Sequence, residues 1–287
     1  MAITVRHHDS VDEFLATAGP FLGAHEAENN LILGIASAIQ ATPEVFEERP
    51  ALATAGYDDG QVVAATLRTP PYNQVLSWTE VVATSAAFAD ALQDQPLPGL
   101  LGPTEAAARF AEEWTRFTGQ RARLEVAERI FRLQSVIPPE RPAQGGWRIV
   151  EDGDRDLIAS WVVAFSEEAE PESSPIRDPI AVADRWVAQV GRIGYVWEAL
   201  GSVVSFVGAS GSTPNGIKIA PVYTPPEQRH RGYASALTAA ASQDQLDRGR
   251  RFVFLFTDLS NPTSNKIYRA IGYEPVCDMD QYRFDDA

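Results

Sequence analysis

The chain has 287 residues, of which 45% are apolar, and this is enough to build two domains of ordinary size. Its formal net charge of −15 disfavours a broad surface for nucleic acid or an anionic membrane, because both would repel the protein as a whole. A single cysteine excludes an internal disulfide, and four scattered histidines have no metal-ligand spacing, so we predict no metal site.

The sequence lacks the signals of a membrane or secreted protein. The longest purely apolar run, 252–256, is far too short to cross a bilayer, and the first six residues lack the apolar core of a signal peptide. We therefore expect a soluble, unprocessed, cytoplasmic protein. The acidic surface suits a cationic substrate, although an acidic excess more commonly serves solubility.

The first half of the chain reads as helical sequence followed by strands. Three strands are predicted, at 51–57, 61–68 and 74–78. The first two are joined by Asp58-Asp59-Gly60, and an Asp-Gly step favours the positive φ angles of a hairpin turn. A helix is predicted over 106–117, because its apolar residues recur at helical spacing.

Residues 135–146 form the clearest linker. Their prolines and glycines, from Pro138-Pro139 to Gly145-Gly146, cannot sustain a helix or a central strand. The expected organisation is therefore a first domain over 1–134 and a second domain over 147–287.

The second half repeats the plan of the first. In chain order, the predicted elements are a helix at 156–165, strands at 194–199, 202–209 and 217–224, a helix at 234–246 and a strand at 252–256. Each half thus has helical material, then a strand pair with a tight turn, then a turn-rich Thr-Pro element and another strand. This similarity predicts an internal duplication.

The last strand of this series turns into its helix through the motif Arg-x-x-Gly-x-Ala at 229–234. The first turn of a helix leaves several N–H groups without partners, and the helix dipole favours an anion there. Gly232 and Ala234 are small enough to let a phosphate approach these amides, while three basic side chains at 229–231 add charge. The pattern predicts an anion-binding turn for a phosphate-bearing cofactor.

Two further segments make this pattern specific. Val222-Tyr223-Thr224-Pro225-Pro226 precedes the turn, and Asn261-Pro262 opens a segment that runs through Tyr268 to Gly272-Tyr273. Together these motifs resemble the GNAT superfamily of acyl-CoA-dependent N-acyltransferases. The resemblance implies an α/β fold of tandem GNAT-like domains. Each would be a mixed, mostly antiparallel twisted sheet flanked by helices, with a splayed pair of parallel strands in the second domain.

The resemblance also implies acetyl-CoA as the acyl donor. The pantetheine arm would take the place of a strand where the parallel strands splay, and the pyrophosphate would lie on the amides of the turn. The cofactor-binding residues implied in this way are Val222, Tyr223, Thr224, Arg229, His230, Arg231, Gly232, Tyr233, Ala234, Ser235, Asn261 and Ser264.

Tyr268 has the most concrete implied catalytic role. When an amine attacks a thioester, the departing thiolate needs a proton, and the family assigns this general-acid role to the matching tyrosine. The plainer interpretation is a helix tyrosine with a buried ring and a solvated hydroxyl. A covalent route through Cys277 is disfavoured, because no histidine lies near it in the sequence.

A general base is harder to identify, because the predicted central strand has no carboxylate. Glu167 and Glu168, in the acidic run 167–172, are candidates for holding a cationic amine or relaying its proton, although a solvated loop is the default for such a run. Asp258 and Tyr223 are further candidates.

The leading hypothesis is an acetyl-CoA-dependent N-acetyltransferase that moves an acetyl group directly to a primary amine of a small molecule or peptide. The first half lacks both signature motifs. We therefore expect it to be a degenerate GNAT-like module, or a divergent α/β domain, that shapes the acceptor site without binding acyl-CoA.

Two alternatives stay open: a non-catalytic acyl-CoA-binding or regulatory module, and a tandem relative such as mycothiol synthase. An aminoacyl-transferring ligase is disfavoured, because its tRNA carrier would need a basic surface. We expect a monomer or homodimer whose partners are acetyl-CoA and an amine acceptor, with no nucleic-acid or membrane partner.

Overall fold

The computed structural model describes residues 2–46, 48–169 and 176–286. The chain forms two compact units. Unit 1 comprises Met1–Phe131, Phe256–Pro262 and Pro275–Ala287. Unit 2 comprises Arg132–Leu255 and Thr263–Glu274.

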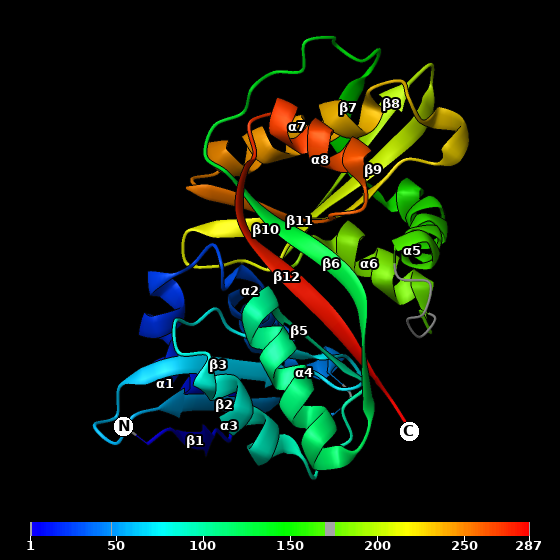
Figure 1. Cartoon of the computed structure of the whole chain (residues 1–287). Coiled ribbons are helices and arrows are strands. Elements are labelled where there is room, and N and C mark those ends of the chain that lie inside the picture. The colour runs from blue at the N-terminus through cyan, green and yellow to red at the C-terminus, as the bar shows by residue number, and fades with distance from the viewer. Residues whose placement is uncertain (1, 47, 170–175, 287) are drawn as a thin grey trace. The chain divides into compact units, whose positions relative to one another are not determined.

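Helices and strands follow one another in the same order in the two halves of the chain (Figure 1). The first series is β1 (Thr4–His7), α1 (Val11–Ala24), α2 (Asn30–Ala41), β2 (Ala51–Gly56), β3 (Val62–Arg68), β4 (Gln74–Leu76), α3 (Ala83–Leu92), β5 (Gly99–Pro103), α4 (Thr104–Thr118) and β6 (Arg121–Leu133). The second series is β7 (Gly146–Ile149), α5 (Arg155–Ala169), α6 (Pro179–Ala188), β8 (Ile193–Ala199), β9 (Ser202–Ser210), β10 (Gly216–Tyr223), α7 (Tyr233–Asp247), β11 (Phe252–Asp258), α8 (Pro262–Ala270) and β12 (Glu274–Asp285). Single 3₁₀ turns lie at Pro43–Val45, Asp152–Asp154 and Pro226–Gln228. This repeat confirms the predicted tandem α/β fold.

The sheet of unit 1 has the strand order β1-β2-β3-β4-β5-β12-β6. The pairs β1–β2, β2–β3, β3–β4 and β5–β12 are antiparallel, whereas β4 and β5 run parallel with Val75 opposite Leu101. The C-terminal strand β12 pairs with β5, with Met279 opposite Pro103. The C-terminal segment, expected in the second domain, thus completes the sheet of unit 1.

Aromatic packing explains why β12 belongs to unit 1. Phe284 is 6% exposed and lies 5.4 Å from the ring of Trp114 and 6.3 Å from that of Phe110, both on α4. Both α4 residues are themselves buried, as the helical spacing at 106–117 predicts. Phe284 thus adds a third ring to the stack of Phe110 and Trp114, and its burial stabilises β12 on this core.

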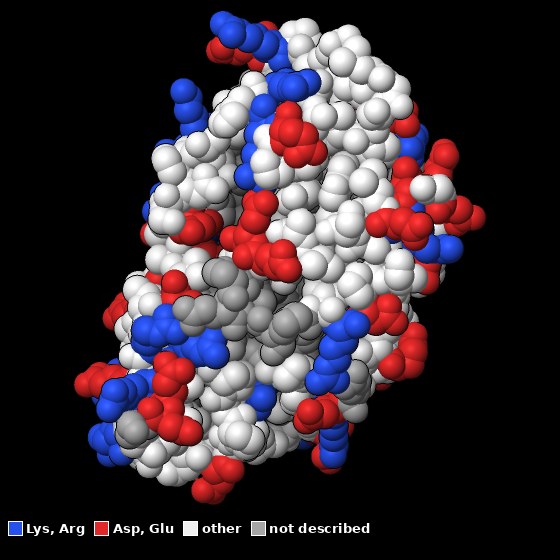
Figure 2. Space-filling view, turned by 90° about the vertical axis from the view of Figure 1, so that its right-hand side faces the viewer, with Lys and Arg blue, Asp and Glu red and all other residues white. Residues whose placement is uncertain are grey.

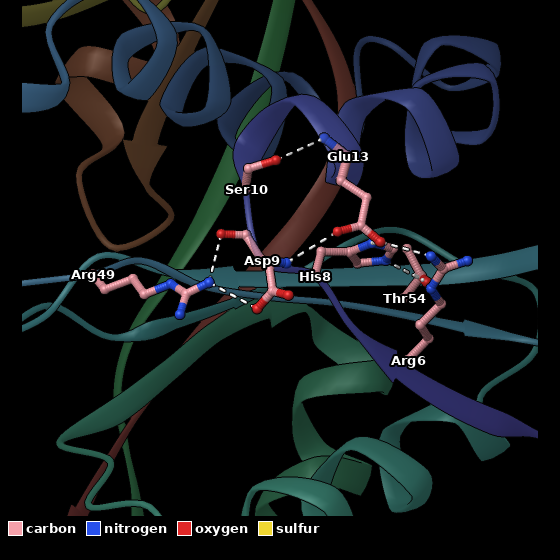
Figure 3. A network of polar contacts seen from close by, with 7 residues as sticks. All are labelled: Arg6, His8, Asp9, Ser10, Glu13, Arg49 and Thr54. Atoms are coloured by element: carbon pink, nitrogen blue, oxygen red, sulfur yellow. Dashed lines mark hydrogen bonds and ion pairs between the residues drawn. The ribbon is translucent and has the colours of Figure 1, made fainter.

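A polar cluster ties β1 to α1 and β2 in unit 1 (Figure 3). Ser10 caps α1 by accepting the backbone N–H of Glu13, and the Glu13 carboxylate binds Arg6 at 2.6 Å. His8 is buried: its Nε2 lies 3.0 Å from the Thr54 hydroxyl, while its Nδ1 lies 3.4 Å from the Glu13 carboxylate without a hydrogen bond. Burial lowers the pKa of His8, because the charged imidazole would lose its hydration.

The sheet of unit 2 has the strand order β11-β10-β9-β8-β7. Three antiparallel pairs lead from β7 to β10, and β10 then runs parallel to β11. Helices α5 and α6 cover the face that carries Val196 and Phe206. Helix α7 covers the other face, where the Tyr195 hydroxyl donates to Asp244 of α7. This is the predicted mixed sheet flanked by helices (Figure 1).

No helix in the described parts of the chain is long and apolar enough to cross a membrane.

On the face shown in Figure 2, acidic side chains alternate with basic ones, so the net charge of −15 is not gathered there into one acidic patch.

Candidate functional site

The parallel strands of unit 2 separate after a short stretch of pairing. β10 pairs with β11 only from Gly216 to Lys218, although β10 continues to Tyr223. Directly after this pairing, the register between β10 and β9 shifts by one residue between Ile219 and Val222. The bulge contains Pro221, which has no N–H to give to a ladder. Backbone groups at this end of β10 are therefore available to a ligand that lies alongside as a strand.

A buried hydroxyl fixes the end of β10. Ser205 on β9 is fully buried and donates to the Tyr223 carbonyl at 3.0 Å, and its hydroxyl also shares a hydrogen bond of 2.8 Å with that of Thr224. The Tyr223 ring packs against Trp161 of α5 at 5.8 Å. The sequence analysis missed Ser205, whose signal is a polar residue inside the apolar run 203–207.

The anion-binding turn (229–235) has the geometry of a nest of amides. His230 and Gly232 have positive φ angles of 63° and 81°, and Gly232 is the N-cap of α7. The six backbone N–H groups from His230 to Ser235 donate to no protein group in the parts of the chain that the structure describes. Successive unpaired amides at a helix N-terminus attract a phosphate or another anion.

The small residues keep the turn accessible. Gly232 is exposed, and a Cβ built there would meet only the side chain of Ala143, at 3.9 Å. The positive φ angle, rather than crowding within the protein, therefore favours glycine at 232. Tyr233 is buried beneath the turn, while Ala234 and Ser235 are half-buried.

Arg229 braces the turn instead of projecting freely from its rim. Its Nε donates to the Thr224 carbonyl at 2.8 Å, and its terminal nitrogen binds both carboxylate oxygens of Glu168, at 2.9 and 2.6 Å. The turn is thus tied to β10 and to the end of α5. Arg231 is exposed and donates to the Glu227 carbonyl at 3.3 Å, and His230 is exposed beside it.

The two candidate glutamates therefore differ in their surroundings. Glu168 is engaged by Arg229, whereas the neighbouring Glu167 is exposed on the last turn of α5. The rest of the predicted acidic run, 170–172, lies outside the described residues.

Tyr268 on α8 is a buried phenol. It is 9% exposed, its ring meets that of Tyr273 edge-on at 6.0 Å, and Tyr273 in turn shares a hydrogen bond of 2.8 Å with Ser242 of α7. Burial raises the pKa of Tyr268 to about 12, so the hydroxyl stays protonated at neutral pH. Among the described residues its oxygen has no hydrogen-bond partner. Tyr268 can therefore give a proton to a ligand atom.

The other residues considered in the sequence analysis lie outside the anion-binding turn and the end of β10. Asn261 and Ser264 are at the beginning of α8, where Asn261 is exposed in unit 1 and Ser264 is half-buried in unit 2. Asp258 accepts hydrogen bonds from the backbone N–H and the hydroxyl of Ser260. Cys277 belongs to unit 1, and burial raises the pKa of its thiol to about 12. An unreactive thiol of this kind does not support a covalent route.

The corresponding turn of unit 1 is built differently. After β4, the Trp78 N–H donates to the side-chain oxygen of Asn29 at 2.8 Å, and the Val81 N–H donates to the Thr79 hydroxyl at 3.0 Å. The Thr84 N–H donates to the Val81 carbonyl. At least three of the N–H groups that follow β4 are thus used within the protein.

Comparison with known proteins agrees with this geometry. Residues 155–273 match the model of the acetyltransferase (GNAT) family. No curated protein matches the sequence.

Solved structures show the same fold along nearly the whole chain. A Drosophila protein superposes with a TM-score of 0.68 at 14% identity, covering 100% of this chain and 99% of that one. A tandem GNAT protein from the clavulanic acid biosynthesis pathway gives 0.60 at 14% identity, covering 99% and 98%. A GCN5-related N-acetyltransferase from Sphaerobacter thermophilus gives 0.60 at 16% identity, covering 99% and 95%.

Proposed function

We propose that the chain, whose residues 155–273 match the model of the acetyltransferase (GNAT) family, is an acetyl-CoA-dependent N-acetyltransferase. The acceptor is a primary amine, and the acetyl group is transferred directly. One active site, in unit 2, carries the reaction.

The observation that carries this proposal is the run of six amides from His230 to Ser235, which have no partner among the described residues and lie next to the open end of β10. The pyrophosphate of coenzyme A fits the amides, since they and the dipole of α7 attract negative charge. The pantetheine arm carries two amides that fit the backbone groups of Val222 and Thr224. Arg231 and His230, both exposed, would add positive charge at the rim.

The bound donor supplies a thioester carbonyl carbon, which the amine nitrogen attacks. The new C–N bond forms as the C–S bond breaks, and the electron pair leaves with sulfur. Tyr268 donates its hydroxyl proton to this thiolate and regains a proton from solvent. The amine loses a proton, for which we propose Glu167 or a water at the same position, because Glu168 is occupied by Arg229.

The experiment follows free thiol while the full-length protein is incubated with acetyl-CoA and a panel of primary amines, alongside a direct measurement of acetyl-CoA binding. We expect binding and amine-dependent thiol release. Binding without release for any amine would favour a non-catalytic acyl-CoA-binding module. Absence of binding would overturn the proposal.

A further inference from the structure

Two arginines of unit 2 are close enough for their charges to interact, and neither has a carboxylate partner among the described residues. Arg192, just before β8, lies over the ring of Trp186 with its guanidinium carbon 5.0 Å from the ring centre. Arg185, on α6, has a buried Nε that makes no hydrogen bond. Within the described ranges, no ion pair or hydrogen bond of either side chain to another group is found.

This arrangement is costly to the folded protein. Burial lowers the pKa of Arg192 to about 10, and the nearby charge of Arg185 lowers it as well. A desolvated cation beside a like charge destabilises the fold unless an anion compensates. The chain has 39 acidic residues against 24 Lys and Arg, so carboxylates are abundant. Groups kept at such a cost are typical of binding sites.

Other arginines of unit 2 show what ordinary pairing looks like in this protein. Arg148 binds Asp154 at 2.6 Å, and Arg155 binds Asp184 on α6, one residue before Arg185. Arg229 binds Glu168. Among the residues that the structure describes, Arg185 and Arg192 have no such carboxylate partner.

Trp186 follows Arg185 on α6 and lies under Arg192, and its ring reaches the sheet beside the bulge of β10. Its ring packs edge-on against Phe206 at 5.6 Å, on the face opposite to α7. A Cβ at Gly208 would lie 2.5 Å from the Trp186 ring and 2.7 Å from the carbonyl oxygen of Ala220, so only glycine lets the indole fit here. Ala220 belongs to the bulge of β10, next to the backbone groups proposed for the pantetheine arm.

We propose that Arg185 and Arg192 bind an oxyanion of the acceptor, a carboxylate or a phosphate, so that the substrate is an amine that also carries a negative charge. Assigning this anion to the acceptor rests on the proposed transferase function. Guanidinium groups suit either oxyanion, because each presents several donors in one plane. Coenzyme A would have its pyrophosphate at the N-terminus of α7, which covers the other face of the sheet.

The test uses matched pairs of amines: β-alanine against β-alaninamide for the carboxylate, and phosphoethanolamine against ethanolamine for the phosphate. Binding is measured by calorimetry on the full chain, and thiol release is measured with acetyl-CoA. We expect the wild type to favour the anionic member of at least one pair. Arg185→Gln and Arg192→Gln should each raise its Kd and KM about 10- to 100-fold, leaving the neutral amine unchanged.

Arg155→Gln is the matched control, because it removes one positive charge from the same helix pair yet leaves both proposed ligands in place. The Arg185→Gln variant should fold with a Tm no lower than that of the wild type, since the charge it removes has no carboxylate partner among the described residues. Equal binding of both members of each pair by the wild type, or an anion preference retained in both variants, would overturn the inference. If no amine releases thiol, the transferase proposal fails, while the binding measurements still decide the role of the arginines.

Discussion

Tyr268 is the residue on which the proposed chemistry depends most. Its hydroxyl stays protonated at neutral pH, because burial raises its pKa to about 12. We expect Tyr268→Phe to lower kcat by about 100-fold or more, since a general acid contributes at least that much, and to leave the Kd for acetyl-CoA unchanged. Thiol-release assays measure kcat, and calorimetry measures the Kd for acetyl-CoA.

The matched control is Tyr72→Phe, which removes the hydroxyl of a tyrosine that is 71% exposed in unit 1. It should leave both quantities unchanged. Full turnover in Tyr268→Phe across the working pH range would remove this residue from the mechanism.

His8 makes the stability of unit 1 depend on pH. Its pKa in the folded protein lies below the ordinary value of 6.5, so the unfolded chain binds the proton more tightly. The stabilisation is fully present above 6.5 and is lost as the pH falls below it. Glu13 acts in a lower window, since hydrogen bonds from the Asp9 N–H and Arg6 lower its pKa from 4.5.

We therefore expect the amides of β1 and β2 to exchange hydrogen faster at pH 5.5 than at pH 7.5, after correction for the intrinsic rate. His8→Gln, which keeps a side-chain nitrogen for Thr54, should flatten this difference, and His7→Gln, on an exposed neighbour, should not. Mass spectrometry of the two strands measures it. An unchanged pH dependence in His8→Gln would contradict the assignment.

Among the elements, β12 shows how a C-terminal strand can stabilise the first unit. Phe284→Ala should destabilise unit 1 by about 3–5 kcal/mol, because it leaves a cavity beside Trp114 and Phe110. Urea unfolding, monitored through hydrogen exchange of the α4 amides, measures the loss in the free energy of unfolding. Leu124→Ala, at a position 49% exposed on β6, is the control and should cost little. A loss below about 1 kcal/mol for Phe284→Ala would mean that β12 adds little to this core.

The elements that could be predicted from sequence are those with a local signal. The helix over 106–117 and the strand over 217–224 were found within a few residues of α4 and β10, because periodicity and turn residues report local structure. The place of β12 in unit 1 could not be predicted in this way. It depends on pairing with β5, more than 170 residues earlier, and strand pairing leaves no mark in local composition.

The candidate site likewise has features with a local sequence signal and features that depend on contacts between distant segments. The anion-binding turn was visible, since glycine and arginine spacing encode it. Contacts between distant segments were not visible in the sequence. The ion pair between Arg229 and Glu168 and the hydrogen bonds of Ser205 form only when α5 and β9 pack in the fold. The same holds for Arg192, which lies over Trp186 of α6. Pro221 inside a predicted strand was a readable signal for the bulge.

At the scale of the whole molecule, one fold occurs twice and one anion-binding turn occurs once. In unit 2 the amides from His230 to Ser235 have no partner among the described residues, while in unit 1 the side chains of Asn29 and Thr79 accept from the Trp78 and Val81 amides after β4. We therefore predict that the chain binds one acyl-CoA, in unit 2.

Calorimetric titration of the full chain with acetyl-CoA tests this most directly, with Gly232→Glu and Gly249→Glu as matched variants. Both glycines have positive φ angles, 81° and 94°, so both variants carry similar backbone strain and the same added charge, but only Gly232 lies in the anion-binding turn. We predict one site per wild-type chain, no binding by Gly232→Glu and unchanged binding by Gly249→Glu. Two sites per chain, or full affinity in Gly232→Glu, would contradict a single acyl-CoA site at the anion-binding turn.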